Sequence, residues 1–229
     1  MLDVKQATKV FSAGTASEHH ALNGLDLHLD EGEFVTIIGS NGAGKSTLFN
    51  AICGNYWLDQ GQIFLDGQDI TFLSEHRRAR QIGRVFRDPM KGTAPHLTIE
   101  ENLALAYTRK DRKPFRSAVR KQEKDLFRTE LEKYHMDLEN RMKTKVGLLS
   151  GGQRQVVTLL MCTLVMPKLL LLDEHTAALD PGAAEKILAM TARIAAEQKL
   201  TCLMVTHNMR AALALGNRTL MMNNGQIVL

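Results

Sequence analysis

The chain has 229 residues, of which 44% are hydrophobic and 24% charged, with a formal net charge of +4 at pH 7. This is the ordinary composition of a soluble globular protein, and the length allows a large core in one α/β domain. The mild positive charge permits an acidic ligand but does not require nucleic acid, and we expect no nucleic-acid partner.

The cysteines and the hydropathy of the chain argue against three classes of protein: disulfide-rich, zinc-binding and membrane-spanning. Cys53, Cys162 and Cys202 are odd in number and widely spaced, which argues against a disulfide framework or a zinc site. The longest apolar stretch, 156–172, is interrupted at Pro167. A membrane-spanning helix needs about 20 apolar residues, so we predict a buried helix followed by a buried strand there. Any membrane role is therefore expected to need a partner.

The first third of the chain predicts a strand, a glycine-rich loop and a helix. Residues 21–29 alternate apolar and polar side chains, as a half-exposed antiparallel strand does. Residues 34–38 are a short β-branched run, and 47–52 favour a helix. Residues 63–67 indicate another strand that enters a turn.

Helical patterns dominate between residues 88 and 149, after which α/β alternation returns. Residues 169–172 and 200–205 are aliphatic runs typical of parallel strands buried on both faces, and Asn223-Asn224-Gly225 predicts a hairpin turn. We therefore expect one α/β domain over residues 1–229. It would have a mostly parallel sheet, an N-terminal antiparallel β subdomain and a helical lobe inserted at about 88–149.

The glycine-rich loop matches the P-loop pattern G-x-x-x-x-G-K-[ST] between its strand and its helix. Its residues are Gly39, Ser40, Asn41, Gly42, Ala43, Gly44, Lys45, Ser46 and Thr47. Glycines allow successive backbone N–H groups to converge on phosphates at a helix N-terminus. Lys45 is expected to bridge the β- and γ-phosphates of a nucleotide, and Ser46 to offer its hydroxyl to Mg²⁺. The fold is thus predicted to be that of a P-loop NTPase.

Two further groups of residues complete the predicted chemistry. The strand at 169–172 ends in Asp173 and Glu174, which would deliver two carboxylates beside the P-loop, at the strand ends where open α/β sheets bind ligands. The alternative is a surface Asp-Glu pair that only ends a strand. Ser150 followed by Gly151, Gly152 and Gln153 predicts a capped helix whose bare N-terminus is a second anion-binding device. An ordinary capped helix is the alternative, but glycine is unfavourable inside a helix, so it leaves the Gly-Gly pair unexplained.

The P-loop, the segment Leu149-Ser150-Gly151-Gly152-Gln153 and the apolar run that ends in Asp173-Glu174 together resemble the ATP-binding cassette family over nearly the whole chain. The resemblance implies that Asp173 holds Mg²⁺, through water, and that Glu174 is the general base for the attacking water. It also implies that residues 150–153 close over the γ-phosphate bound to a second subunit, so that two chains share two ATP molecules.

The resemblance assigns three more residues. His207, after the strand at 200–205, matches a histidine that contacts the γ-phosphate and the lytic water; a capping or packing role is the alternative. Phe11 matches the aromatic residue that stacks on adenine, with a core phenylalanine as the alternative. Asp180 lies in a segment that resembles a loop crossing the interface between the two subunits.

The chain departs from the family pattern at two positions. Arg87 stands where the family usually has a glutamine that touches Mg²⁺ and the lytic water, and a guanidinium cannot be a metal ligand because it has no lone pair to offer. It could turn outward or pair with the γ-phosphate. His175 replaces the proline that usually follows the catalytic glutamate, and we expect a local structural role for it. The strings 173–180 and 204–209 resemble those of a subgroup of bacterial importers, whose solutes include aromatic amino acids.

These observations predict an ATP hydrolase, the ATP-binding subunit of an importer. It would work as a pair of cassettes, expected to be a homodimer, beneath a membrane permease that a solute-binding protein serves indirectly. It would lie at the cytoplasmic face of the cell membrane and use ATP and Mg²⁺, with the segment 87–102 touching the permease. The alternative is a regulatory or non-transport ATP-binding protein that hydrolyses weakly because of Arg87.

Overall fold

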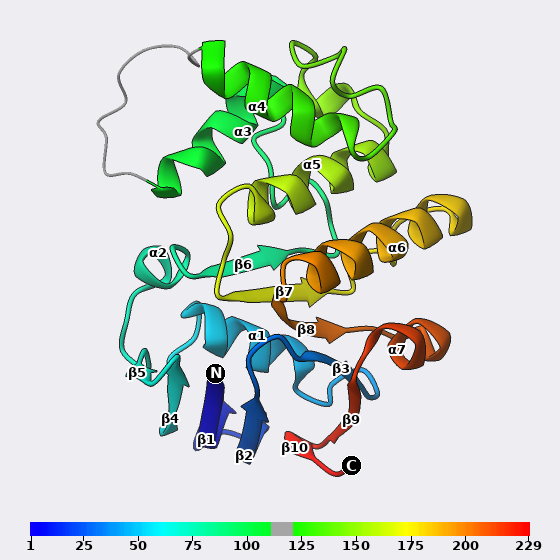
Figure 1. Cartoon of the computed structure of the whole chain (residues 1–229). Helices are drawn as coiled ribbons and strands as arrows, with labels where there is room; N and C mark the ends of the chain where they lie inside the picture. Colours follow the sequence, from blue (N-terminus) through cyan, green and yellow to red (C-terminus); the bar gives the residue numbers. More distant parts are fainter. Residues whose placement is uncertain (111–120) are drawn as a thin grey trace. The chain divides into compact units, whose positions relative to one another are not determined.

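The computed structural model describes residues 1–110 and 121–229 (Figure 1), so residues 111–120 of the expected helical lobe lie outside the described residues. The described chain divides into two compact units. The first comprises Met1–Gly83, Lys168–Glu174 and Ile194–Leu229, and the second comprises Arg84–Pro167 and His175–Arg193.

The first unit begins with an antiparallel sheet in the order β2-β1-β4-β5. Its strands are β1 (Leu2–Phe11), β2 (His19–Leu29), β4 (Gln60–Leu65) and β5 (Gln68–Asp69). Leu2 of β1 pairs with Leu29 of β2 on one side and with Leu65 of β4 on the other. All three side chains are buried, so this sheet has the single apolar face that its alternating sequence predicts.

A second sheet has the strand order β10-β9-β3-β8-β7-β6. Its strands are β3 (Phe34–Ile38), β6 (Ile82–Val85), β7 (Leu169–Asp173), β8 (Thr201–Val205), β9 (Arg218–Asn223) and β10 (Gln226–Ile227). β3 runs parallel to both β8 and β9, and β7 runs parallel to β8. Parallel strands place their carboxyl ends at one edge of the sheet. The P-loop, Asp173 and the residue after Val205 therefore emerge at the same edge, which is the basis of the site.

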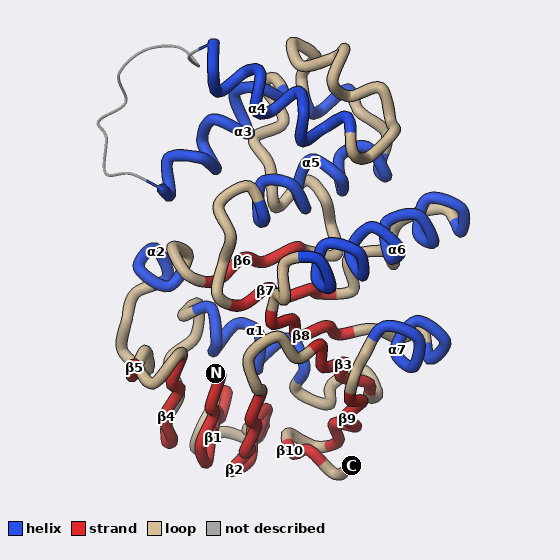
Figure 2. Tube along the Cα trace, viewed as in Figure 1, coloured by secondary structure: helices blue, strands red, loops and turns tan. Residues whose placement is uncertain are grey.

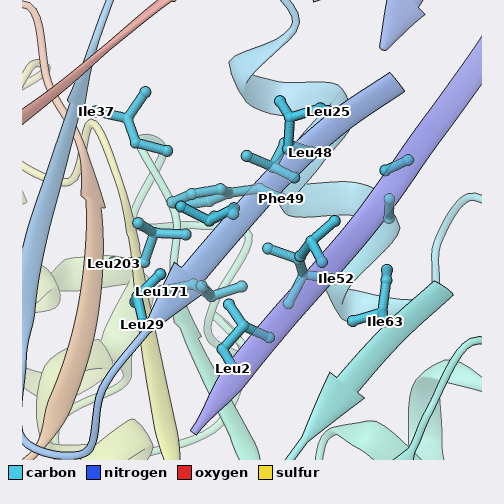
Figure 3. Close-up of a cluster of buried hydrophobic side chains, with 14 of the residues drawn as sticks. Leu2, Leu25, Leu29, Ile37, Leu48, Phe49, Ile52, Ile63, Leu171 and Leu203 are labelled. Atoms are coloured by element: carbon cyan, nitrogen blue, oxygen red, sulfur yellow. The ribbon is translucent and has the colours of Figure 1, made fainter. Parts of the chain in front are cut away.

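The core of the first unit is aliphatic and surrounds the helix that follows the P-loop. α1 (Lys45–Cys53) buries Leu48, Phe49 and Ile52. Figure 3 shows these side chains in one cluster with residues from both sheets, among them Leu2 and Leu171. Burial of this apolar face fixes α1, and with it the P-loop at its N-terminal end. The remaining helices of this unit are α2 (Glu75–Arg78) and α7 (Met209–Leu215).

The second unit is mainly helical (Figure 2). Its helical segments are α3 (Ile99–Tyr107), the short 3₁₀ turn Thr108–Lys110, α4 (Lys121–Glu132), the 3₁₀ turn Val146–Leu148, α5 (Gly151–Thr163) and most of α6 (Pro181–Glu197). α3 begins with a capping box, in which Thr98 accepts a hydrogen bond from the backbone of Glu101 and the Glu101 side chain bonds back to Thr98. No helix in the described part of the chain is both long enough and apolar enough to cross a bilayer.

The fold class is confirmed: an antiparallel N-terminal sheet accompanies a parallel-rich α/β sheet. The predicted hairpin is also present, because β9 and β10 are antiparallel and Asn224 and Gly225 have φ of 46° and 74°. Two consecutive residues with positive φ are the mark of a type I′ turn, for which Asn-Gly is the favoured pair.

Candidate functional site

The P-loop connects β3 to α1 in a backbone path that two of its glycines make possible. Gly44 is the N-cap of α1, with φ of 101°, and a Cβ added there would lie 2.2 Å from the Ala21 carbonyl oxygen. Gly39 has φ of 154°, and a Cβ there would lie 2.3 Å from the carbonyl oxygen of Met222. Only glycine fits at these two positions, because both the torsion angle and the close backbone neighbour exclude a side chain.

The hairpin formed by β9 and β10 contacts the P-loop through its backbone. The Gly225 N–H donates to the Ala43 carbonyl at 3.0 Å, and the Gly225 carbonyl accepts from the Asn23 N–H, also at 3.0 Å. With the Met222 carbonyl beneath Gly39, the hairpin fixes both ends of the loop. The sequence predicts this hairpin but gives no sign that it contacts the P-loop.

Lys45, the first residue of α1, turns its ammonium group into the P-loop. Its Nζ donates to the carbonyls of Gly39 at 2.8 Å and Ser40 at 2.7 Å. Burial lowers the pKa of Lys45, whereas the nearby carboxylates of Glu174 and Asp173 raise it. The structure thus brings a lysine and both predicted carboxylates together around the loop.

Glu174 and His207 form a close side-chain pair at this edge of the sheet. Glu174 Oε1 lies 2.8 Å from His207 Nε2, with the glutamate side chain 12% exposed and the histidine 45% exposed. The backbone N–H of Glu174 donates to the Val205 carbonyl at 3.0 Å, so the ends of β7 and β8 are tied together where these side chains emerge. A partly buried carboxylate that a histidine orients can act as a base and accept a proton from a water molecule.

Ser46 and Asp173 carry the oxygen atoms that could hold a divalent cation. Ser46 is the exposed second residue of α1, and Asp173 is the half-buried last residue of β7. Hydroxyl and carboxylate oxygens are the ligands Mg²⁺ prefers, and nucleotide sites commonly use one or two protein ligands together with substrate phosphates. The described residues contain no cluster of three His, Cys, Asp or Glu side chains that could hold a metal alone. The donor set fits Mg²⁺ brought in with a nucleotide.

Phe11, at the end of β1, is half-buried rather than part of the core. Its ring meets Tyr56 edge to face with centroids 5.4 Å apart, and Lys9 Nζ lies 5.7 Å from the ring centre. The core alternative for Phe11 is therefore not what the structure shows, and the residue lies in the same unit as the P-loop.

The remaining predicted site residues lie in the second unit, and three of them cap or open helices. Ser150 Oγ accepts from the Gln153 N–H at 3.3 Å, and Gln153 Oε1 accepts from the Ser150 N–H at 3.2 Å, which is a complete capping box at the start of α5. Asp180 Oδ1 accepts from the Ala183 N–H at 3.0 Å at the start of α6. Each motif has a local structural role besides any role in binding.

Close packing accounts for part of the Gly-Gly pair after Ser150. A Cβ on Gly152 would lie 3.2 Å from the Cβ of Ala183, and one on Gly151 would lie 3.2 Å from a methyl carbon of Leu179. An ordinary capped helix therefore does not leave the two glycines wholly unexplained. Packing of α5 against α6 also favours them.

Arg87 is exposed and is the second residue after the end of β6. The carbonyl of its neighbour Phe86 accepts from Nε2 of Gln155, a fully buried residue of α5, at 3.2 Å. The sequence analysis did not single out Gln155. The sequence could have indicated it, because Gln155 is a polar residue in the predicted helix that begins at Ser150, and a polar residue on the buried face of a helix needs a hydrogen-bond partner.

Comparison with known proteins agrees with this geometry. A family model described as ABC transporter matches residues 22–177, more than half of the chain. The tyrosine transport ATP-binding protein of Clostridioides difficile is 43% identical over all of this chain and 91% of its own length. The sulfate/thiosulfate import ATP-binding protein CysA of Caulobacter vibrioides is 34% identical over 90% of this chain, which spans only 59% of that relative.

Solved structures show the same fold. A dimeric post-hydrolysis state of the ATP-binding cassette MJ0796, bound to ADP and Pi, superposes with a TM-score of 0.86 at 29% identity, over 100% of this chain and 97% of that one. A second dimeric structure of MJ0796 gives a TM-score of 0.83 at 30% identity. The chain belongs to the ABC transporter family. It is an ATP-binding transport subunit of the ATP hydrolase class.

Proposed function

We propose that residues 1–229 form one nucleotide-binding domain in which Glu174 is the general base of ATP hydrolysis. The observation that carries the proposal is the 2.8 Å pair of Glu174 Oε1 and His207 Nε2 at the strand edge that also bears Lys45. A carboxylate held by a histidine beside a phosphate-binding loop is the arrangement that can take a proton from water attacking a γ-phosphate.

Lys45, Glu174, His207, Phe11 and the pair Ser46 and Asp173 each have a part in the proposed mechanism. Lys45 Nζ exchanges its two carbonyl partners for phosphate oxygens and offsets the negative charge that develops during transfer. Glu174 accepts the proton of the attacking water while His207 fixes the direction of the carboxylate and contacts the γ-phosphate. Phe11 stacks on adenine. Mg²⁺, when bound by Ser46 and Asp173, would neutralise charge on the β- and γ-phosphates.

The proposed assembly follows from the relatives. Dimeric cassettes among the solved structures support pairing of two copies of this chain, with residues 150–153 and Asp180 completing the site of the partner. Import subunits among the relatives support a membrane permease as the second partner, contacted by the segment 87–102, and a location at the cytoplasmic face of the membrane. The tyrosine transport relative supports uptake of an aromatic amino acid, delivered by a solute-binding protein.

The test is Mg²⁺-dependent ATP hydrolysis by the purified chain beside two variants. Glu174→Gln keeps the size of the side chain but cannot accept a proton, so we expect kcat to fall at least ~100-fold with ATP affinity preserved. Unchanged hydrolysis in Glu174→Gln would contradict the assignment of the base.

Arg87→Gln tests whether an arginine in place of the family's usual glutamine changes the rate of ATP hydrolysis. We expect it to change kcat less than about threefold, because the guanidinium is exposed and cannot coordinate a cation. If the wild-type chain instead binds ATP without hydrolysis and Arg87→Gln hydrolyses it, Arg87 is a brake and the regulatory alternative is correct.

A further inference from the structure

The backbone of Glu174 adopts a conformation that its surroundings must enforce. Its φ is 47°, in the left-handed region, which is disfavoured for any residue that carries a Cβ. Such a conformation persists only where neighbouring interactions fix it, and it is found most often at functional sites. A general base in this conformation depends on what holds the chain on each side of it.

On its N-terminal side, Glu174 is held by the first unit. Its N–H donates to the carbonyl of Val205 in β8, and its carboxylate meets His207. These interactions fix the amide plane that enters the residue and one oxygen of the side chain. The peptide plane that follows Glu174, and hence its ψ, is shared with the next residue.

That residue is His175, which is only 2% exposed. Its Nε2 lies 3.3 Å from Thr191 Oγ1, and Thr191 Oγ1 lies 2.8 Å from the carbonyl oxygen of Ile187, one turn earlier in α6. A threonine hydroxyl has one proton, and the Ile187 carbonyl can only accept it. The hydroxyl oxygen must therefore accept from His175, which makes the ring the neutral tautomer with its proton on Nε2.

Burial agrees with the neutral ring, because it lowers the pKa of His175 to about 4. His175, Thr191 and Ile187 all belong to the second unit. The hydrogen bonds thus stay inside that unit, and the peptide bond from Glu174 to His175 connects them to the base.

We propose that His175 is a positioning residue for hydrolysis: its hydrogen bond to Thr191 anchors the peptide plane after Glu174, maintains the left-handed backbone and so aims the carboxylate. The inference rests on the proposed role of Glu174 as the base. The competing view is that the imidazole only fills space in the core, in which case any ring of similar size serves equally well.

Two variants break the hydrogen bond while retaining volume, His175→Phe and Thr191→Val. We expect either change to lower kcat about 10- to 100-fold, because a base displaced by a fraction of an ångström to 1 Å transfers its proton inefficiently. KM for ATP should stay within about twofold, since neither residue is part of the P-loop. Thr191→Ser restores the hydroxyl and should restore kcat to within about threefold of wild type.

Thr158→Val is the matched control. Thr158 is also a buried helical threonine whose hydroxyl donates to a carbonyl four residues earlier, that of Arg154 in α5 at 3.0 Å, but no histidine bonds to it in the described structure. Loss of that hydroxyl costs a comparable amount of stability without any effect on the base, so kcat should remain near wild type.

The readouts separate positioning from damage to the fold and from failure of the proposed function. Each kcat is expressed per ATP-binding molecule, so that a poorly folded fraction does not lower it. In the Glu174→Gln background, adding Thr191→Val should leave ATP affinity and the residual rate unchanged, because the base is already absent. If Glu174→Gln alone hydrolyses ATP like wild type, the proposed function fails before His175 is tested. If Glu174→Gln is inactive but His175→Phe and Thr191→Val keep wild-type kcat, or lose no more than Thr158→Val, His175 is a packing residue and the inference is wrong.

Discussion

At the scale of single residues, His175 links acid sensitivity to one buried side chain. The pKa of the ring falls from 6.5 to about 4 in the folded chain because burial opposes its charged form. Above pH 6.5 the ring is neutral in both states and has no effect. As the pH falls from 6.5 towards 4, His175 binds a proton in the unfolded chain but stays neutral in the native chain. The free energy of unfolding therefore decreases.

The expected loss is about 1.4 kcal/mol per pH unit, or roughly 3 kcal/mol across the window. Urea unfolding of wild type and His175→Phe between pH 7.5 and 4.5 measures it as a difference in slope, with the phenylalanine variant losing less stability. His28 is the control of opposite sign. Its pKa is raised by hydrogen bonds to Asp3 and then Asp30, so it stabilises the fold at low pH and loses that contribution as the pH rises through its folded pKa. Parallel curves for wild type and His175→Phe would show that the ring is not buried as described.

At the scale of the secondary-structure elements, Arg78 fastens the P-loop helix at the end opposite the loop. The side chain is 2% exposed. Its guanidinium donates to the carbonyls of Ala51 and Ile52 in the last turn of α1, and to those of Leu73 and Thr71. Carbonyls at a helix C-terminus lack intrahelical partners and carry partial negative charge, so a buried cation there satisfies both needs.

Arg78→Met should therefore lower the free energy of unfolding by about 3 kcal/mol or more, since it removes a buried charged donor from four main-chain carbonyls, of which that of Ala51 retains the Gly54 N–H as a donor. Arg80→Met, on the exposed side of the same connection, should cost less than about 0.5 kcal/mol. Urea denaturation of the two variants compares them directly. Equal stabilities would mean that water replaces the guanidinium at no cost.

The same element shows where sequence reasoning stops. The strand, loop and helix around Lys45 could be predicted, because β-branched residues, glycines and helix formers act locally. The boundaries of β3 at 34–38 agree with the prediction to the residue. Arg78 could not be predicted, because in the sequence it is one of several basic residues in a short segment, a pattern typical of solvated surface. Only the fold brings four main-chain carbonyls around it.

The candidate site divides in the same way. Its chemistry could be predicted from motifs: the P-loop, the carboxylates at the end of β7 and the histidine after β8. The supports of those motifs could not, because the Gly225 contact with Ala43 and the His175 contact with Thr191 join residues far apart in the sequence or on different elements. Gly151 and Gly152 are the opposite case: the sequence predicts them as part of a binding motif, and the structure shows that close packing also favours glycine at both positions.

At the scale of the whole molecule, helix α1 begins after Gly44 and helix α5 after Ser150, and we propose that these two N-termini bind the phosphates of different ATP molecules. We therefore expect ATP binding to promote dimerisation of two copies of this chain. Glu174→Gln with Mg-ATP is expected to sediment at twice the monomer mass, whereas wild type, which consumes its ATP, returns to monomer. Analytical ultracentrifugation at several protein concentrations measures this.

Lys45→Ala in the Glu174→Gln background is the control, because loss of the ammonium weakens phosphate binding and should keep the chain monomeric at the same ATP concentration. A Glu174→Gln chain that is saturated with ATP and still monomeric would show that residues 150–153 do not close over a partner's nucleotide.

The support of the P-loop by residues 222–225 has a consequence for the order in which the protein is made. The ribosome completes the loop at 39–47 early, but the backbone that lies under Gly39 and bonds to Ala43 is synthesised almost two hundred residues later. A nascent chain therefore contains the P-loop long before it contains residues 222–225, which contact the loop. Nucleotide therefore cannot stabilise early folding intermediates through a finished loop, and we expect tight ATP binding only after residues 222–225 have been synthesised.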